Sequence, residues 1–183
     1  MSGADVSVHC LTDAVGSQHL WSFGRTLSKP TSRARSRRCG GHALRVVVDT
    51  NVWVSGLINP ASVPGKVLEL VRAGRVQAVA SWGFAEEIVE VLRRPRLRRY
   101  RITERDVADV LVVLAPLLPD VDIEVEPRDP GDAPVVSAAV AAAADMIVTG
   151  DHGLLEDGRL RRWLEQRGVD MRTPAEFVEE FGA

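Results

Sequence analysis

The sequence predicts an α/β fold in which helices cover both faces of a mostly parallel sheet. Two runs rich in β-branched residues, "RVVVD" at 45–49 and "DMIVTGD" at 145–151, have the composition of buried parallel strands. Helical segments lie between the predicted strands, an alternation that is typical of parallel sheets. The segment 129–144 becomes an alanine-rich helix, whose small side chains suit close packing on a sheet.

The first half of the regular region contains two strands and three helices. Gly74 follows the first helix as a C-terminal stop signal, and Pro95 terminates the second. Ser81 is a favoured N-cap for the second helix, and Thr103 with Asp106 forms a near capping box for the third. The predicted elements are strands at 45–49 and 76–81 and helices at 62–73, 82–94 and 104–118.

The second half contains three strands and three helices. Apolar and polar residues alternate over 121–126, which predicts a strand. Thr173, Pro174 and Glu176 occupy the cap, first and third positions of a final helix, as in a capping box. The predicted elements are strands at 121–126, 145–151 and 169–172 and helices at 129–144, 159–168 and 174–181.

The charge of the chain is unevenly distributed. The 183 residues include 23 Lys and Arg and 25 Asp and Glu, and 45% of them are hydrophobic, enough for the core of one domain. Residues 1–44 hold six of the basic and two of the acidic residues, which leaves 17 basic and 23 acidic residues from 45 onward. We expect residues 1–44 to be a flexible basic extension, or translated sequence upstream of the true start. The acidic body indicates clustered carboxylates, which need cations.

Several classes of protein are excluded by composition. The two cysteines, Cys10 and Cys39, form neither a disulfide framework nor a zinc-site spacing, and the body has none. A body without cysteine suits the reducing cytoplasm, where we expect the protein to reside. No apolar run is long enough for a transmembrane helix, so no membrane partner is expected.

Four acidic residues are expected at one edge of the sheet. Asp49 and Asp151 each end a predicted strand, and ligands of such folds bind beyond the carboxyl ends of the strands. Glu87 borders the apolar stripe of its helix, and Asp132 lies at the start of the alanine-rich helix. Taken singly, each Asp is also explained as a helix cap and Glu87 as part of a solvated helix face. Asp145, which precedes its strand, belongs at the opposite edge and is interpreted as structural.

Together, four carboxylates at one edge would repel one another strongly, because these motifs contain no matching Lys or Arg. Hard divalent cations resolve this repulsion, and Mg²⁺ and Mn²⁺ prefer oxygen ligands. A site with two such ions activates water and stabilises the leaving oxygen of a phosphodiester. The sequence therefore predicts a site for one or two Mg²⁺ or Mn²⁺ ions.

The motifs "VVVDTNVWVSGL", "SWGFAEEIVEVLRRPRLRRY" and "DPGDAPVVSAAVAAAADMIVTGD", in this order, resemble the PIN domain. They are most similar to the branch that forms toxins of toxin–antitoxin pairs. The resemblance covers roughly residues 45–180, so a PIN-like domain is expected at 45–183. It implies a three-layer α/β/α sandwich and a metal-dependent ribonuclease that leaves a 5′-phosphate. It also implies a cognate antitoxin and a homodimer.

Residue roles follow from the same resemblance. Asp49, Glu87, Asp132 and Asp151 match the acidic quartet that is both catalytic and metal-binding. Asn51 and Thr149 match its polar helpers. Ala133 follows Asp132 where this branch often has another Asp or Asn, so a fifth carboxylate is absent there and Asp129 could replace it.

An arginine cluster follows the helix that carries Glu87. Arginine binds phosphate oxygens bidentately and stacks on bases, so the cluster is a candidate contact for RNA or for an acidic segment of a protein partner. A solvated surface is the alternative. His152 could donate to a phosphate, whereas Trp82 and Phe84 are expected in packing. The cluster comprises Arg93, Arg94, Arg96, Arg98, Arg99 and Arg101.

Two other functions stay open. A phosphatase could use Asp49 as its nucleophile, but the haloacid-dehalogenase type normally has a second Asp two residues later, where this chain has Asn51. A PIN-like module without catalysis could bind RNA or protein, although the intact quartet argues against it.

Overall fold

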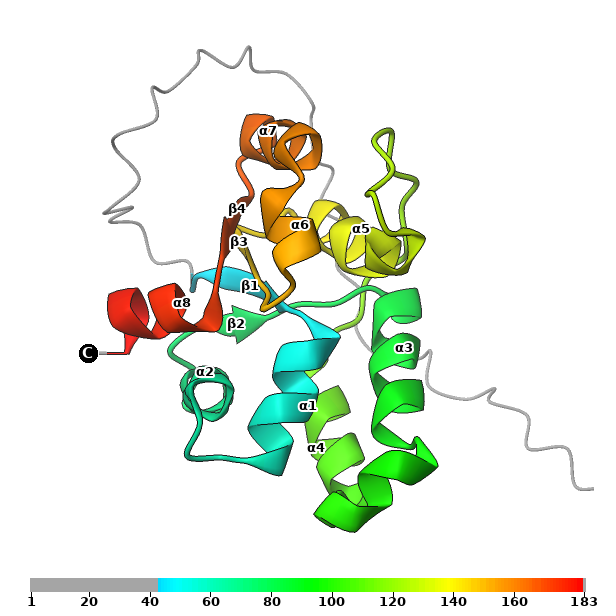
Figure 1. Cartoon of the computed structure of the whole chain (residues 1–183), viewed down its shortest axis with the longest axis vertical. Coiled ribbons are helices and arrows are strands. Elements are labelled where there is room, and N and C mark those ends of the chain that lie inside the picture. Colours follow the sequence, from blue (N-terminus) through cyan, green and yellow to red (C-terminus); the bar gives the residue numbers. More distant parts are fainter. Residues whose placement is uncertain (1–42, 183) are drawn as a thin grey trace, which may run out of the picture. The chain divides into compact units, whose positions relative to one another are not determined.

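The computed structural model describes residues 43–182 and contains a four-stranded, wholly parallel sheet in the order β2-β1-β3-β4 (Figure 1). The predicted α/β class is therefore confirmed. Residues 1–42, which hold both cysteines and most of the predicted extension, lie outside the described part. The strands are β1 (Arg45–Val48), β2 (Gln77–Ala78), β3 (Met146–Val148) and β4 (Asp170–Arg172).

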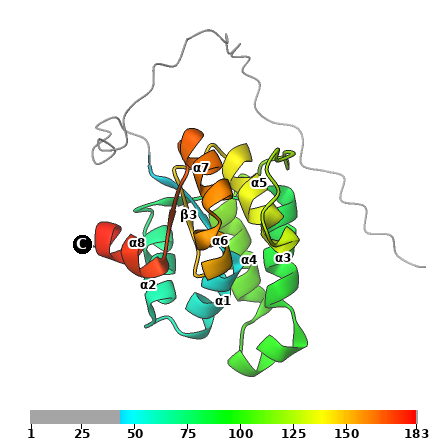
Figure 2. The same ribbon diagram turned by 45° about the horizontal axis from the view of Figure 1, so that its top comes forward.

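Helices cover the sheet on both sides. In Figure 2, α2 and α8 lie on one side of the strands, and α5 and α7 lie on the other. Within residues 43–182, none of the helices is long and apolar enough to cross a membrane. The α-helices are α1 (Thr50–Ile58), α2 (Val63–Arg72), α3 (Trp82–Leu92), α4 (Glu104–Leu114), α5 (Ala133–Ala141), α6 (His152–Glu156), α7 (Gly158–Gln166) and α8 (Pro174–Phe181); the 3₁₀ helices are η1 (Pro95–Tyr100) and η2 (Pro130–Asp132).

The register of the central strands brings distant segments together. Val48 of β1 lies opposite Val148 of β3, and the N–H of Asp49 donates to the carbonyl of Val148 at 3.0 Å. The three β1 valines are at most 1% exposed, as expected for a strand that is covered on both faces. The carboxyl ends of β1 and β3 are consequently neighbours, as the sequence predicts for an Asp49–Asp151 site.

Helix α1 was not among the predicted elements. Its sequence, "TNVWVSGLI", is rich in β-branched residues and does not show one clear apolar stripe. Val52 and Trp53 are 2% exposed, so α1 is held by packing rather than by local propensity. A second short helix, α6, was missed as well.

Two glycines allow α1 and α2 to lie close together. A Cβ on Gly56 would come within 2.7 Å of the Leu68 side chain, and a Cβ on Gly65 would overlap the backbone of Pro60. These close contacts fix the loop between the two helices.

We expect Gly65→Ala to destabilise the fold by about 1–3 kcal/mol, because backbone rather than a flexible side chain blocks the added methyl group. Urea denaturation measures this change. Gly150→Ala is the matched control, since a Cβ there meets nothing within 4 Å. Equal stabilities of the two variants would contradict the close packing described here.

Three predicted elements are corrected by the structure. The segment 121–126 is not a strand: the Ser137 hydroxyl of α5 donates to the carbonyl of Val121 and accepts from its N–H. The helix predicted at 104–118 ends at Leu114, and Ala115 is extended before Pro116, as a residue preceding proline prefers. The helix predicted at 129–144 consists of η2 followed by α5.

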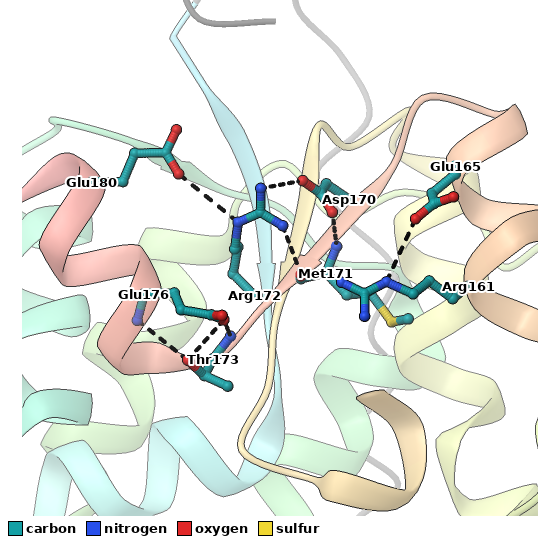
Figure 3. Close-up of polar contacts among 8 residues, drawn as sticks. All are labelled: Arg161, Glu165, Asp170, Met171, Arg172, Thr173, Glu176 and Glu180. Atoms are coloured by element: carbon teal, nitrogen blue, oxygen red, sulfur yellow. Dashed lines mark hydrogen bonds and ion pairs between the residues drawn. The ribbon is translucent and has the colours of Figure 1, made fainter. Parts of the chain in front are cut away.

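Polar contacts fix the start of α8. The predicted capping box is present: the N–H of Thr173 donates to the Glu176 carboxylate at 2.8 Å, and the N–H of Glu176 donates to the Thr173 hydroxyl at 3.2 Å (Figure 3). Arg172 forms an ion pair with Asp170 at 2.7 Å and a longer one with Glu180 at 3.9 Å. This junction holds Pro174 at the edge where the site residues gather.

Candidate metal centre

Four elements each contribute one carboxylate to the same edge of the sheet. Asp49 follows β1, Glu87 lies on α3, Asp132 ends η2, and Asp151 follows β3. The charges are close enough to interact, because the other three carboxylates and Asp129 all raise the pKa of Asp132. The predicted quartet is thus brought together.

Asp49 is the most enclosed member and is 9% exposed. Its Oδ2 accepts a 2.5 Å hydrogen bond from the Thr149 hydroxyl, and its Oδ1 accepts from the N–H of Asn51 at 3.4 Å. Burial raises the pKa of Asp49; the Thr149 hydrogen bond partly offsets this rise, and Asp151 adds to it. Asp49 therefore caps α1 while its charge remains incompletely compensated.

Thr149 connects two members of the quartet. It is fully buried, its hydroxyl donates to Asp49, and the same oxygen accepts from the N–H of Asp151 at 2.9 Å. A hydroxyl has one proton to donate, so these contacts fix its orientation. Thr149 thereby links Asp49 to Asp151, and its role beside metal ions stays a prediction.

Glu87 is half-buried on the inner border of α3, whereas Glu86 and Glu90 are exposed, as the helical pattern predicts. The Thr50 hydroxyl donates to Glu87 Oε1 at 3.1 Å. Burial raises the pKa of Glu87; the Thr50 hydrogen bond lowers it, and Asp49 raises it. Thr50 is a site residue that sequence reasoning missed, although it is part of "DTN".

Asp132 differs from the other two aspartates because its side chain makes no capping hydrogen bond. Asp132 occupies the N-cap position of α5, but the expected side-chain cap is absent, so that part of the interpretation is wrong. Burial and the neighbouring carboxylates raise its pKa to about 6. Asp151, in contrast, caps α6 through its Oδ1, which accepts from Gly153 at 2.6 Å and Leu154 at 3.3 Å.

Of the other predicted residues, Asp129 and Asn51 lie near the quartet, and Asp145 lies at the opposite edge of the sheet. Asp129 caps η2 by accepting from Gly131 at 2.8 Å, and its charge reaches Asp132. The side chain of Asn51 is exposed beside Asp151. Asp145 accepts from the N–H of Arg45 at 3.0 Å at the opposite edge, which confirms its predicted structural role. A buried cap that sequence reasoning missed is Asp157, 5% exposed at the start of α7.

The quartet suits Mg²⁺ or Mn²⁺ in its chemistry. All donors are hard oxygens, and desolvation together with mutual repulsion raises the pKa of Asp49, Glu87 and Asp132, so a cation would be favourable. Among residues 43–182, no group of three or more His, Cys, Asp or Glu side chains is arranged so that it could hold a metal ion.

The arginine cluster lies largely on η1. Leu97 is buried and anchors this segment, while the arginines are exposed. Arg93 pairs with Glu104 at 2.7 Å, and Arg99 stacks over the ring of Tyr100 at 4.9 Å.

The two aromatic residues at the start of α3 behave differently. Phe84 is 1% exposed and packs in the core, as expected. Trp82 is 55% exposed, so the prediction that it serves in packing is wrong. The Ser81 cap leaves Trp82 at the first position of the helix.

Comparison with known proteins agrees with this arrangement. A family profile described as "PIN domain" matches residues 45–153, which span all four carboxylates. The uncharacterized protein MJ1680 of Methanocaldococcus jannaschii is 31% identical over 147 residues, which cover 75% of this chain and 92% of that protein.

Proposed function

This chain belongs to the PIN-domain family, whose members are generally metal-dependent nucleases, and from this premise we propose that it is an endoribonuclease. The observation that carries the proposal is that carboxylates from four separate elements lie at one edge of the sheet, where Thr149 links Asp49 to Asp151 and Thr50 bonds Glu87. We further propose that it is the toxin of a toxin–antitoxin pair, acting in the cytoplasm.

In the proposed mechanism, Asp49, Asp132 and Asp151 would hold one or two Mg²⁺ or Mn²⁺ ions, and Glu87 would hold a second ion or orient the attacking water. When bound, the ions would activate water and neutralise charge on the phosphate. Thr149 keeps the Asp49 carboxylate oriented through its hydrogen bond, and Thr50 does the same for Glu87. Attack from the side opposite the 3′-oxygen would leave a 5′-phosphate on the product.

Cleavage of a mixed RNA pool, with Mn²⁺ and with EDTA, tests the proposal. Metal-dependent cleavage with 5′-phosphate ends supports it, and a 2′,3′-cyclic phosphate refutes the mechanism. Ion binding without RNA cleavage, together with turnover of a small phosphate ester, would favour the phosphatase instead. Neither cleavage nor ion binding would favour a binding module.

The arginine cluster is proposed to bind the RNA backbone. Replacing three of its arginines with Gln should weaken the binding of single-stranded RNA. The slope of the logarithm of the binding constant against the logarithm of the salt concentration should become shallower by about 2, since each phosphate contact contributes about 0.7 to this slope. Fluorescence anisotropy at several salt concentrations, with EDTA present, measures both. Three exposed arginines on α2, α4 and α7 provide a control of equal charge, and an equal effect there would contradict a specific contact. The test variant changes Arg96, Arg98 and Arg99, and the control changes Arg72, Arg105 and Arg162.

A protein partner is also part of the proposal. A cavity of about 820 Å³ is lined mainly by α3 and by the residues that follow it, while α4 contributes Leu111 and the segment after α4 contributes Leu117. The exposed Trp82 forms part of its wall. We take the apolar face of a small antitoxin as its occupant and propose a homodimer of the toxin. Co-expression with a neighbouring short reading frame, followed by measurement of the mass of the complex, tests both.

A further inference from the structure

A second cavity, of about 460 Å³, opens beside the acidic edge. Its volume lies within the range of small-molecule sites, roughly 300–1,000 Å³. Asp151 belongs both to the quartet and to this cavity, so a ligand inside would lie next to a phosphate at the quartet. The lining residues come from α1, α2, the β3–α6 turn and the start of α8: Asn51, Val52, Ser55, Pro64, Gly150, Asp151, His152 and Pro174.

The lining combines apolar surfaces with unused polar groups. Val52, Pro64 and Pro174 provide the apolar part. The side chains of Asn51 and Ser55 are exposed, and neither makes a hydrogen bond within residues 43–182. An amide and a hydroxyl can each donate and accept, which suits the polar edge of a flat heterocycle whose faces contact apolar side chains.

The charge of the lining disfavours an anionic ligand. The Asp151 carboxylate forms part of the wall, and the Asp151 charge already raises the pKa of Asp49 and Asp132. Within this lining, His152 is the one side chain that can carry a positive charge. A neutral ring is therefore a better occupant than a second phosphate.

The walls of the cavity are held in place before any ligand binds. The close approach of α1 and α2 at Gly56 and Gly65 fixes Ser55 relative to Pro64. The Thr173–Glu176 capping box fixes Pro174, as Figure 3 shows for the two capping residues. A preformed site loses little free energy in ordering its side chains when it binds a ligand.

We propose that this cavity binds the base of a nucleotide adjacent to the scissile phosphate and thereby determines which RNA sequences are cut. The inference rests on the proposed ribonuclease function, because it assigns the cavity to the same substrate. Ser55 then acts as a specificity-determining residue, with its hydroxyl at the edge of the base.

To test this, each of the four neutral ribonucleosides is added to the metal-free protein, and binding is measured from NMR chemical shifts of the backbone amides. Shifts concentrated at Ser55, Gly150 and His152, with one base preferred, are the expected result. Ser55→Leu fills the cavity and should weaken this binding at least about tenfold, whereas Ala108→Leu, which adds the same side chain to an exposed position of α4, should not. No shifts at the cavity, or equal binding by the Ser55 variant, would overturn the inference.

A parallel cleavage assay separates this inference from the proposed function. RNA cleavage by Ser55→Leu with an altered sequence preference supports the cavity assignment. Cleavage with an unchanged preference overturns it while the ribonuclease proposal stands. Nucleoside binding at the cavity by a protein that cuts no RNA would uphold a base site and overturn the proposed function.

Discussion

Asp49→Asn is expected to reduce RNA cleavage by about 100- to 1,000-fold, the size of effect seen when one group that stabilises transition-state charge is removed. The amide keeps the volume of the carboxylate but loses the charge that would hold a cation. Its oxygen can still accept from the Thr149 hydroxyl, which donates to Asp49 at 2.5 Å. Initial rates of RNA cleavage in saturating Mn²⁺ measure the loss.

The same substitution should leave the metal-free fold at least as stable as the native protein. Burial and repulsion raise the pKa of Asp49, so its charge is unfavourable when no cation is present. Asp145→Asn is the matched control, since Asp145 lies at the opposite edge and accepts from the N–H of Arg45. Full activity of Asp49→Asn, or equal loss in Asp145→Asn, would refute the assignment of Asp49.

Mn²⁺ should raise the melting temperature more at pH 7.5 than at pH 5. The pKa of Asp132 is raised to about 6, and those of Asp49 and Glu87 are raised as well. Groups with raised pKa values stabilise the fold fully below their unfolded pKa, near 4, and lose this contribution as the pH rises through the folded value. The metal-free protein should therefore lose stability between about pH 4 and pH 7.

A bound cation replaces the lost protons, so its stabilising effect grows over the same pH range. At 100 times its dissociation constant, an ion that binds only the folded state stabilises by about 2.7 kcal/mol. Differential scanning calorimetry at the two pH values, with and without Mn²⁺, gives the comparison. An equal shift at both pH values, or an undiminished shift in Asp132→Asn, would contradict a site at this quartet.

Most of the helices and the central strands were readable from local patterns, because caps and strand composition are local properties. Ser81, Thr103 and Thr173 all cap helices as expected. One failure has a long-range cause. Residues 121–126 alternate like a strand, yet the Ser137 hydroxyl satisfies the backbone of Val121 from 16 positions away. No local pattern encodes such a contact.

For the site, too, local patterns predicted some features, and features that depend on tertiary packing were missed. The positions of Asp49 and Asp151 follow from a general rule for parallel sheets, which needs only the strand ends. Thr50 was missed because its hydrogen bond to Glu87 depends on how α1 crosses α3. The cavity beside Asp151 depends equally on tertiary packing, since its walls come from segments up to 123 positions apart, from Asn51 to Pro174.

The pairing of β1 with β3 also has a consequence for folding during synthesis on the ribosome. Val48 and Val148 are separated by 100 positions and yet lie opposite each other, so the domain has a high contact order at its centre. A ribosome must release nearly the whole chain before Asp49 can meet Thr149 and Asp151. The proposed site therefore cannot be assembled until synthesis of the domain is almost finished.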